Sequence, residues 1–389
     1  MATCAIQTGW RASVEMLRYS SICRKISPNA PVFLSVPNST ITHIQRRSLS
    51  ILPFGLDIGL LGVAVYFFTK LPKPDPSNVT SIFGPPSGSK EGEANPKKVV
   101  KCIAHRGAGL DAPENTLQAF KYCVAMECNF IEMDVRTSKD GQLVLLHDQG
   151  LERLTGTDIT DVRFMDWDSI KNIDVGATHP NRQQFKDVTL CLLEDAIDYL
   201  LANKVKMIID VKGEDAQVVN GILRVFSGNP VLYENAVVTS FNPYVLYQIR
   251  KRDPNIVGAM SYRPHCFAYL NYDAENGPTN PRFGDRLALQ ALSRAADCVH
   301  GALWRSAARW CSVSAVLLHK DIVSPREVEY WRSRNVRVAG WCVNRPVEKL
   351  YWRAVLRAPY LANTLIGEPE VDKKEFEEGK EQRKLVEMD

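Results

Sequence analysis

Short apolar runs alternate with stretches of helical spacing through most of this 389-residue chain. Eight of these runs have the length and the Val, Ile and Leu content of buried strands, and they occupy residues 100–104, 130–135, 143–146, 207–211, 236–239, 256–260, 315–318 and 336–343. Eight strands alternating with helices over about 270 residues predict a (β/α)8 TIM barrel, an α/β fold. An open doubly wound sheet is the alternative, but no Gly-x-Gly-x-x-Gly turn opens a helix here.

One connection is longer than a barrel requires. It covers residues 262–313, between the sixth and seventh strand candidates, and we interpret it as an insertion. Residues 286–310 within it set leucines and tryptophans beside arginines at helical spacing. A basic amphipathic helix of this kind is typical of a membrane surface. A soluble insertion that packs its apolar face on the barrel has the same periodicity, so both interpretations stay open.

The first seventy residues differ in composition from the rest. Residues 1–50 are a basic segment, which we treat as disordered, with Glu15 as the one acid. Residues 51–69 are apolar apart from Asp57, and this length just crosses a bilayer core. Aromatic residues lie at the end of this segment and lysines follow it, as at a membrane interface. We therefore predict a transmembrane helix at 51–69, with a buried helix or a removed targeting segment as alternatives.

The charge of the N-terminal segment favours one location of the chain. Its excess of basic residues predicts a cytoplasmic N-terminus, hence a single-pass protein of the plasma membrane, an endomembrane or a vesicle, with the large domain lumenal or extracellular. A mitochondrial transit peptide is the alternative. The Pro-, Gly- and Ser-rich residues 70–98 predict a linker. Residues 99–366 form the predicted barrel, and 367–389 a charged tail.

The overall composition argues against several classes of protein. The net charge is only +4, and no stripe of basic residues with interleaved aromatics occurs in the central region, so we expect no nucleic-acid partner. The ten cysteines lack the close pairs of a zinc site and are interpreted as mostly free thiols. An apolar content of 45% is that of a globular protein with a large core.

Carboxylates gather on two of the predicted strands. Glu132 and Asp134 are two residues apart, so a strand places both side chains on one face. Asp210 and Lys212 repeat this spacing on the fourth strand candidate. The carboxyl ends of barrel strands meet at one mouth, where three carboxylates form a site for one hard divalent cation, Mg²⁺ or Ca²⁺.

Two histidines stand at predicted strand ends beside these carboxylates. His105 follows the first strand candidate, and His147 follows the third. Imidazole titrates near neutral pH, so one ring can accept a proton while the other donates one. A phosphodiester suits this arrangement, because a cation and Lys212 would neutralise its non-bridging oxygens. The residues thus predict a metal-assisted phosphodiesterase.

The order of these motifs resembles the signature of the glycerophosphodiester phosphodiesterase family. The resemblance covers roughly residues 99–366 and looks closest to the membrane-associated type 1 members. It rests on His105-Arg106-Gly107, Pro113-Glu114-Asn115-Thr116, Glu132-x-Asp134, Asp140-Gly141, His147-Asp148, Ile209-Asp210-Val211-Lys212-Gly213 and Gly340-Trp341-Cys342-Val343-Asn344.

This resemblance implies a metal-dependent enzyme that releases sn-glycerol 3-phosphate and an alcohol. It implies that His105 and His147 are the acid–base pair and that Glu132 and Asp134 are metal ligands. Many members place a Glu, in a Glu-x-Lys motif, at the third ligand position. This chain has Asp210 there. The shorter side chain still supplies an oxygen, so we expect metal binding with a slightly displaced ion.

The same resemblance implies roles for four further residues. Arg106 and Lys212 would hold the phosphate, while Glu114 and Asn115 would order the first loop around the site. The leading hypothesis for the substrate is a glycerophosphodiester such as glycerophosphoinositol, in phospholipid metabolism.

Two other hypotheses remain open. One is a lysophospholipase D type of enzyme acting on lysophospholipids or glycerophospho-N-acylethanolamines, because a lipid-facing insertion at 286–310 would suit acylated substrates. The other is a non-catalytic barrel that binds a lipid head group. The loss of a histidine or of a ligand would support that hypothesis, and the sequence keeps them all.

Overall fold

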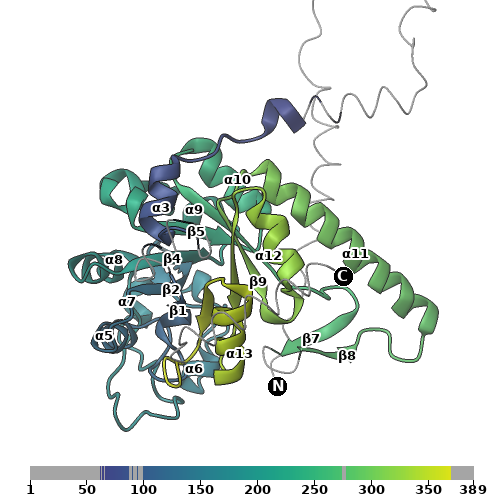
Figure 1. The fold of residues 1–389 in the computed structure, drawn as a ribbon. Coiled ribbons are helices and arrows are strands. Elements are labelled where there is room, and N and C mark those ends of the chain that lie inside the picture. Colours follow the sequence, from purple (N-terminus) through teal and green to yellow (C-terminus); the bar gives the residue numbers. More distant parts are fainter. Residues whose placement is uncertain are drawn as a thin grey trace, which may run out of the picture. The chain divides into compact units, whose positions relative to one another are not determined.

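Eight parallel strands close into a barrel in the computed structural model (Figure 1). The structure describes residues 62, 64, 66–86, 90, 94, 100–273 and 277–368, and the barrel lies in the unit that begins at Thr69. In order around the barrel the strands are β1 (Cys102–Ala104), β11 (Tyr360–Ala362), β10 (Arg337–Trp341), β9 (Ala315–His319), β6 (Val257–Tyr262), β5 (Ala236–Ser240), β4 (Lys206–Val211) and β2 (Phe130–Thr137). Ala104 of β1 pairs with Ile131 of β2 and closes the ring. The predicted TIM barrel is confirmed.

One predicted barrel strand was wrong. The run at 143–146 forms β3 (Leu143–Leu145), which pairs antiparallel with the end of β2 and lies outside the ring. The eighth barrel strand is instead β11, which pairs with β1 and β10. An apolar run specifies burial but not the direction in which the strand will pair. With three residues, β11 is too short to give a periodic signal.

Helices cover the outside of the ring. The longer ones are α5 (Leu117–Ala125), α8 (Leu193–Ala202), α9 (Ala216–Gly228), α10 (Pro243–Arg252), α11 (Leu287–Trp310), α12 (Pro325–Arg332) and α13 (Pro346–Tyr351). Short helices lie in the connections, namely α6 (Glu152–Thr155), α7 (Trp167–Ile170), the 3₁₀ turns His105–Gly107, Val162–Phe164, Pro230–Glu234 and Lys320–Ile322, and a π-helical turn, Trp352–Leu356. Several begin at side-chain caps, such as Thr116 on α5 and Asp215 on α9.

A helix ahead of β1 fills the amino-terminal end of the barrel. It is α3 (Pro76–Phe83), capped by Asp75, and it lies within residues 70–98, where the sequence predicted a linker. Ile82 and Phe83 are buried in one cluster with an inward residue from each barrel strand. Proline at the first turn and two apolar residues at the last explain why this short segment folds onto the core.

The long connection 262–313 contains one ordinary barrel element and one addition. Helix α11 runs between β6 and β9, as a crossover helix does, so the whole range is not an insertion. The addition is a two-stranded antiparallel sheet, β7 (Tyr269–Asp273) with β8 (Gly277–Pro281). It follows β6 and therefore lies on the side where the barrel strands end (Figure 1).

The predicted membrane span requires a correction. Within the described part of the chain, no helix is both long enough and apolar enough to cross a membrane. Even α11, with 24 residues, carries Arg294, Asp297, Arg305 and Arg309. This finding overturns the single-pass membrane location and the lumenal or extracellular domain inferred from it. Residues 1–50, and most of 51–69, lie outside the described residues.

Candidate active site

Three buried carboxylates meet at the carboxyl end of the barrel. Glu132 and Asp134 lie on β2, and Asp210 lies beside Asp134 on β4, where the two residues are in register. One oxygen from each of the three lies within 4.8 Å of the others. The three side chains are almost fully buried. The two-residue spacing and the parallel pairing of β2 with β4 therefore bring together the three predicted ligands.

The charges at this cluster are unbalanced without a further cation. Burial, with Asp134 and Asp210 nearby, raises the pKa of Glu132 well above its usual range. Burial also raises the pKa of Asp210. Burial acts in the same direction on Asp134, but Lys212 and other cations outweigh it and hold that pKa well below its usual range. Asp210 Oδ1 is buried and has no hydrogen bond among the described residues. An oxygen-rich site with these features fits a hard divalent cation.

Lys212 holds the two aspartates of the cluster. Its Nζ lies 2.6 Å from Asp210 Oδ2 and 3.0 Å from Asp134 Oδ1. Burial lowers the pKa of Lys212, but the three carboxylates outweigh it and raise the value above its usual range. The ammonium group also lies 5.1 Å from the centre of the Phe241 ring. Lys212 therefore remains a cation at the inner wall of the site.

Arg106 and Asn115 hold the first loop against β2. The Arg106 backbone N–H donates to Glu132 Oε2 at 2.9 Å, and its Nε lies 3.3 Å from Asp134 Oδ2. Asn115 Nδ2 donates to Asp134 Oδ2, and its Oδ1 accepts from the Asp134 backbone N–H, both at 2.9 Å. Arg106 and Asn115 both have positive φ, at 55° and 56°. Asn tolerates this conformation better than most residues, which explains its use in this tight loop.

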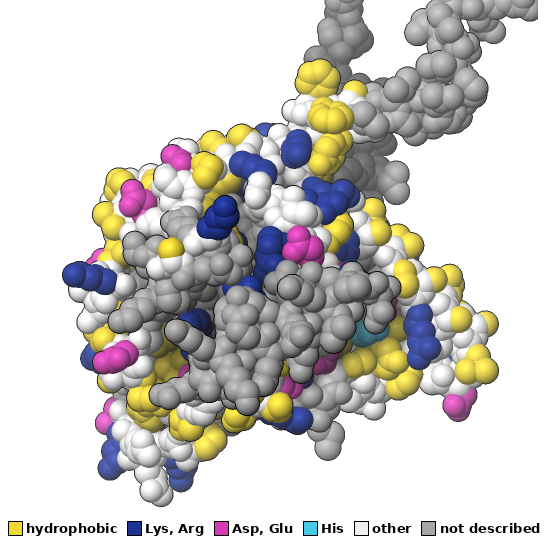
Figure 2. All heavy atoms as spheres, viewed as in Figure 1, with side chains coloured by type: hydrophobic (Ala, Val, Ile, Leu, Met, Phe, Trp, Pro, Cys, Tyr) yellow, Lys and Arg dark blue, Asp and Glu magenta, His cyan; other side chains and the backbone are white. Residues whose placement is uncertain are grey.

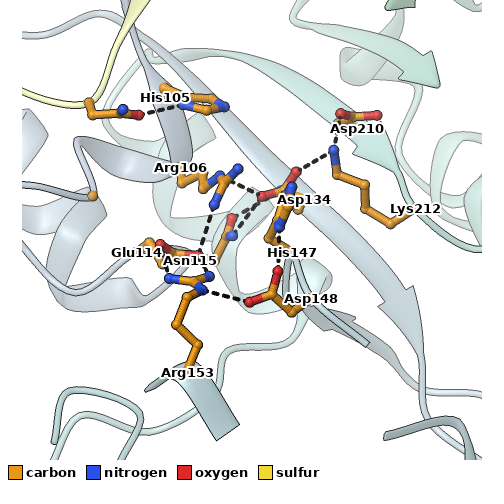
Figure 3. A network of polar contacts seen from close by, with 12 residues as sticks. His105, Arg106, Glu114, Asn115, Asp134, His147, Asp148, Arg153, Asp210 and Lys212 are labelled. Atoms are coloured by element: carbon orange, nitrogen blue, oxygen red, sulfur yellow. Dashed lines mark hydrogen bonds and ion pairs between the residues drawn. The ribbon is translucent and has the colours of Figure 1, made fainter. Parts of the chain in front are cut away.

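A chain of ion pairs connects the first loop with His147 (Figure 3). Glu114 accepts from Arg106 at 3.2 Å and from Arg153 at 2.6 Å. Arg153 Nε lies 2.6 Å from Asp148 Oδ2, and Asp148 Oδ1 lies 2.8 Å from His147 Nδ1. Burial lowers the pKa of His147, and Asp148 opposes this effect. The network fixes the His147 ring from its Nδ1 side.

His105 is fixed by a residue far away in the sequence. Its Nδ1 lies 2.5 Å from Oδ1 of Asn363, which is 258 residues further along the chain. The amide oxygen can only accept, so the ring carries its proton on Nδ1 and presents Nε2 to the site. That Nε2 lies 3.8 Å from Glu132 Oε2. Burial, with Arg106 nearby, lowers the pKa of His105 to about 3.

Asn363 is therefore expected to act as a positioning residue. We expect Asn363→Leu to lower kcat by about tenfold, the effect of roughly 1.4 kcal/mol, because the ring loses its fixed tautomer. KM should change little. Asn363→Asp keeps an acceptor and should restore most of kcat. Steady-state kinetics measures both parameters, and equal losses in the two variants would contradict this role.

Aromatic rings line the other side of the mouth. Trp341, on β10, packs edge-on against His319 at 4.5 Å and against Phe241 at 6.0 Å between ring centres. Tyr272 of β7 packs against His319 at 4.6 Å and lies 3.1 Å from its Nδ1 through the hydroxyl group. These rings form an aromatic wall that meets the charged half of the site where Lys212 Nζ lies 5.1 Å from the Phe241 ring centre, and Tyr272 links the wall to the added sheet.

The structure brings every predicted site residue to one region. Figure 3 shows the two histidines, Arg106, Lys212 and the first-loop residues around Asp134 and Asp210. His147 was predicted to follow a barrel strand. It instead follows β3, which pairs antiparallel with β2 outside the ring. Sequence reasoning missed Arg153 and Asn363. The Asn363 position follows from the pairing of β11 with β1, whereas Arg153 gives no local signal.

Comparisons with known sequences identify the family of this chain. Residues 105–360 match the model of the glycerophosphoryl diester phosphodiesterase family. Glycerophosphodiester phosphodiesterase 1 of Homo sapiens is 31% identical over 278 residues, which are 71% of this chain and 81% of the human protein. The protein of the same name from Bos taurus is 32% identical, over 70% of this chain and 80% of the bovine one.

Comparisons with solved structures agree on the fold. A glycerophosphoryl diester phosphodiesterase structure from Silicibacter pomeroyi has a TM-score of 0.55 at 18% identity, covering 78% of this chain and 97% of that one. An Oleispira antarctica phosphodiesterase, solved in complex with the product sn-glycerol-3-phosphate, has a TM-score of 0.51 at 16% identity, covering 72% and 96%. From the match over residues 105–360 and the mammalian relatives, the chain belongs to the glycerophosphoryl diester phosphodiesterase family of enzymes.

Proposed function

We propose that this protein hydrolyses glycerophosphodiesters to sn-glycerol 3-phosphate and an alcohol, as an enzyme of phospholipid metabolism that uses one divalent cation. The observation that carries the proposal is the meeting of two histidines, three carboxylates and two cationic side chains at one barrel mouth. The names of the mammalian relatives and the glycerol phosphate complex of the Oleispira enzyme support the substrate class. The proposed catalytic unit spans residues 99–366, which contain all of these side chains.

In the proposed mechanism, the cationic side chains bind the phosphate. Arg106 and Lys212 lie on opposite sides of Asp134, within 3.3 Å and 3.0 Å of its oxygens. Both remain charged at neutral pH, so they would neutralise the non-bridging oxygens of the diester. Glu114 and Asn115 hold Arg106 and the first loop in place through the contacts described above. Preorganised cations of this kind stabilise the charge that develops on phosphorus oxygens.

The cation would be bound by Glu132, Asp134 and Asp210. These three carboxylates converge, and Asp210 Oδ1 has no hydrogen bond among the described residues and so can bind the ion. When bound, a Mg²⁺ or Ca²⁺ ion supplies Lewis-acid polarisation of the phosphoryl oxygens and orients the diester. Oxygen ligands suit both ions. The Asp210 side chain is one methylene shorter than a glutamate at this position would be.

The histidines would divide the proton transfers between them. His105 is neutral and presents Nε2, so it accepts a proton from the attacking water as the water oxygen bonds to phosphorus. Burial lowers the pKa of His147, and its bond to the Asp148 carboxylate opposes this effect by favouring the imidazolium form. His147 therefore donates a proton to the leaving alkoxide as the phosphorus–oxygen bond to the alcohol breaks. The proposal thus assigns the base to His105 and the acid to His147.

A second candidate substrate class is acylated. In the lysophospholipase D alternative, the enzyme cleaves lysophospholipids or glycerophospho-N-acylethanolamines. The aromatic wall of Phe241, Trp341 and Tyr272 favours it, because an apolar wall beside the phosphate site suits a substrate with an apolar part. The third hypothesis is a non-catalytic barrel that only binds a lipid head group. The loss of a histidine or of a metal ligand would support it, and both histidines and all three carboxylates are present.

A panel of substrates tests the proposal. The full-length protein is incubated with glycerophosphoinositol, glycerophosphocholine and lysophosphatidylcholine, each with Mg²⁺, with Ca²⁺ or with EDTA, and the phosphorus products are followed by ³¹P NMR. We expect sn-glycerol 3-phosphate from the soluble diesters with metal and none with EDTA. Release of lysophosphatidic acid alone would select the lysophospholipase D alternative. No turnover with either ion would overturn the proposal.

A further inference from the structure

A cavity of about 420 Å³ lies at the amino-terminal end of the barrel. It is bounded by α3, by the end of α12 and by the segments that lead into β10 and β11. The proposed catalytic side chains lie at the other end, where the barrel strands end. Sites for small molecules usually have volumes of roughly 300–1,000 Å³. The cavity is therefore a candidate binding site that is separate from the mouth of the barrel.

The inner walls of this cavity are apolar. Helix α3 contributes one aromatic and one branched side chain, and the chain from α12 to β10 contributes three more branched ones, namely Val79, Phe83, Val328, Val336 and Val338. All but Val79 are 9% exposed or less. Walls of this kind gain free energy when a hydrocarbon replaces water against them. They therefore favour a ligand that has an apolar part.

Four cationic side chains line the same cavity, and none of the described residues that line it is acidic. They are Lys73, Arg332, Arg337 and Arg357. Arg357 is only 9% exposed, and Arg337 is half-buried. Glu329, outside the lining, pairs with Arg332 at 3.3 Å, but an ion pair this exposed contributes little. The cavity therefore combines apolar walls with a surplus of positive charge.

Two of these cations are held at the cavity by backbone carbonyl groups. Arg337 Nη2 donates to the Gly84 carbonyl at 3.0 Å, just after α3, and Lys73 Nζ donates to the Arg334 carbonyl at 3.5 Å. Figure 2 shows Lys and Arg side chains gathered on the face of the molecule that carries α3 and α12 in Figure 1. Guanidinium groups present a planar fork of N–H donors that matches a carboxylate or a phosphate. Holding them in place before binding lowers the entropy that a ligand must overcome.

We propose that this cavity binds a single-chain anionic amphiphile, either the carboxylate of a fatty acid or the phosphate of an alkyl monoester. The arginines bind the anionic head group, and the valines and Phe83 enclose part of the hydrocarbon chain. Four like charges disfavour a cationic amphiphile, and a small inorganic anion gains nothing from apolar walls. This inference does not depend on the reaction at the mouth of the barrel.

Isothermal titration calorimetry of the full-length protein tests this binding. The probes are decanoate, decyl phosphate, decyltrimethylammonium and inorganic phosphate. We expect one equivalent of decanoate or decyl phosphate to bind, with an affinity at least about tenfold higher than that of either control probe. The tighter of the two anions identifies the head group, a carboxylate in one case and a phosphate monoester in the other.

Three variants locate the binding site. Arg332→Gln with Arg337→Gln should weaken the binding of both anions by at least about tenfold, because two charged donors are lost. Arg334→Gln is the matched control, since Arg334 is an exposed arginine between them that does not line the cavity. Thr80→Trp keeps all the cations and should also abolish binding, because an indole ring from this exposed position of α3 fills the cavity.

Three results would overturn the proposal. The first is equal affinity of the wild type and the double arginine variant for both anions. The second is equal affinity for decanoate and decyltrimethylammonium, which would show unspecific binding of the chain. The third is the absence of binding to the wild type. Hydrolysis of a soluble glycerophosphodiester is measured in parallel and should be the same in all variants, so a failure of the cavity is distinguished from a failure of the proposed reaction.

Discussion

We expect His147→Gln to lower kcat for glycerophosphodiesters by roughly two to four orders of magnitude, with little change in KM. His147 is held by Asp148 at 2.8 Å, and we assign it to the protonation of the leaving alkoxide. Glutamine keeps a polar side chain of similar reach but cannot transfer a proton at neutral pH. The loss should therefore fall on the chemical step, and single-turnover measurements would show it directly.

A substrate with a better leaving group distinguishes the loss of an acid from a general loss of structure in the His147→Gln variant. A p-nitrophenyl ester of glycerol phosphate needs little protonation of its leaving phenolate, so His147→Gln should retain much more of its rate on that substrate. His105→Gln should lose its rate on both substrates, because the base is needed in each case. His300→Gln is a matched control, since His300 is also partly buried but lies on α11. Full activity of His147→Gln on alkyl diesters would refute the assignment.

The barrel was predictable because its strands are buried on both faces. Such strands appear as continuous apolar runs, and seven of the eight candidates lie at barrel strands. The remaining strand, β11, was missed because Tyr360–Ala362 is stabilised by pairing with β1 and β10 rather than by its own pattern. The run at 143–146 has the same composition as a barrel strand, and only its antiparallel pairing with β2 excludes it.

The two halves of the site differ in how far the sequence revealed them. Glu132, Asp134 and Asp210 came from a spacing of two on apolar strands, which is a local signal. Asn363 had no such signal, because its contact with His105 exists only after the ring closes between β1 and β11. Arg153 similarly reaches Glu114 from another connection. Residues that support a site through tertiary contacts are the ones that a single sequence leaves hidden.

The sequence also did not show which face of α11 packs against the rest of the domain. Its periodicity fits a helix that packs apolar residues inward as well as one that presents them outward. The choice is made by Asp297 and Gln290, whose partners are backbone groups of the β6–β7 connection. Those partners lie some twenty to thirty residues away, at separations of 22 and 30. Buried polar groups need such partners, so they turn inward and leave the leucines outside.

The second large effect concerns the cation. We expect a saturating divalent cation to stabilise the wild-type protein by about 2.7 kcal/mol at a hundredfold excess over its dissociation constant, an upward shift of several degrees in the thermal midpoint. Three buried carboxylates with two raised pKa values explain the gain, because the ion neutralises charges that burial disfavours. Differential scanning calorimetry with Mg²⁺, Ca²⁺ or EDTA measures this shift without any activity assay.

Asp210→Asn should remove most of this stabilisation. The variant loses one of three anionic ligands, so we expect the metal concentration for half-maximal activity to rise by at least roughly tenfold. Asp210 is the best choice because Asp134 also binds Arg106, Lys212 and Asn115, and its loss would disturb the fold itself. Glu214→Gln is the matched control, because Glu214 is an exposed carboxylate only four residues after Asp210. Equal metal stabilisation of Asp210→Asn and wild type would place the cation elsewhere.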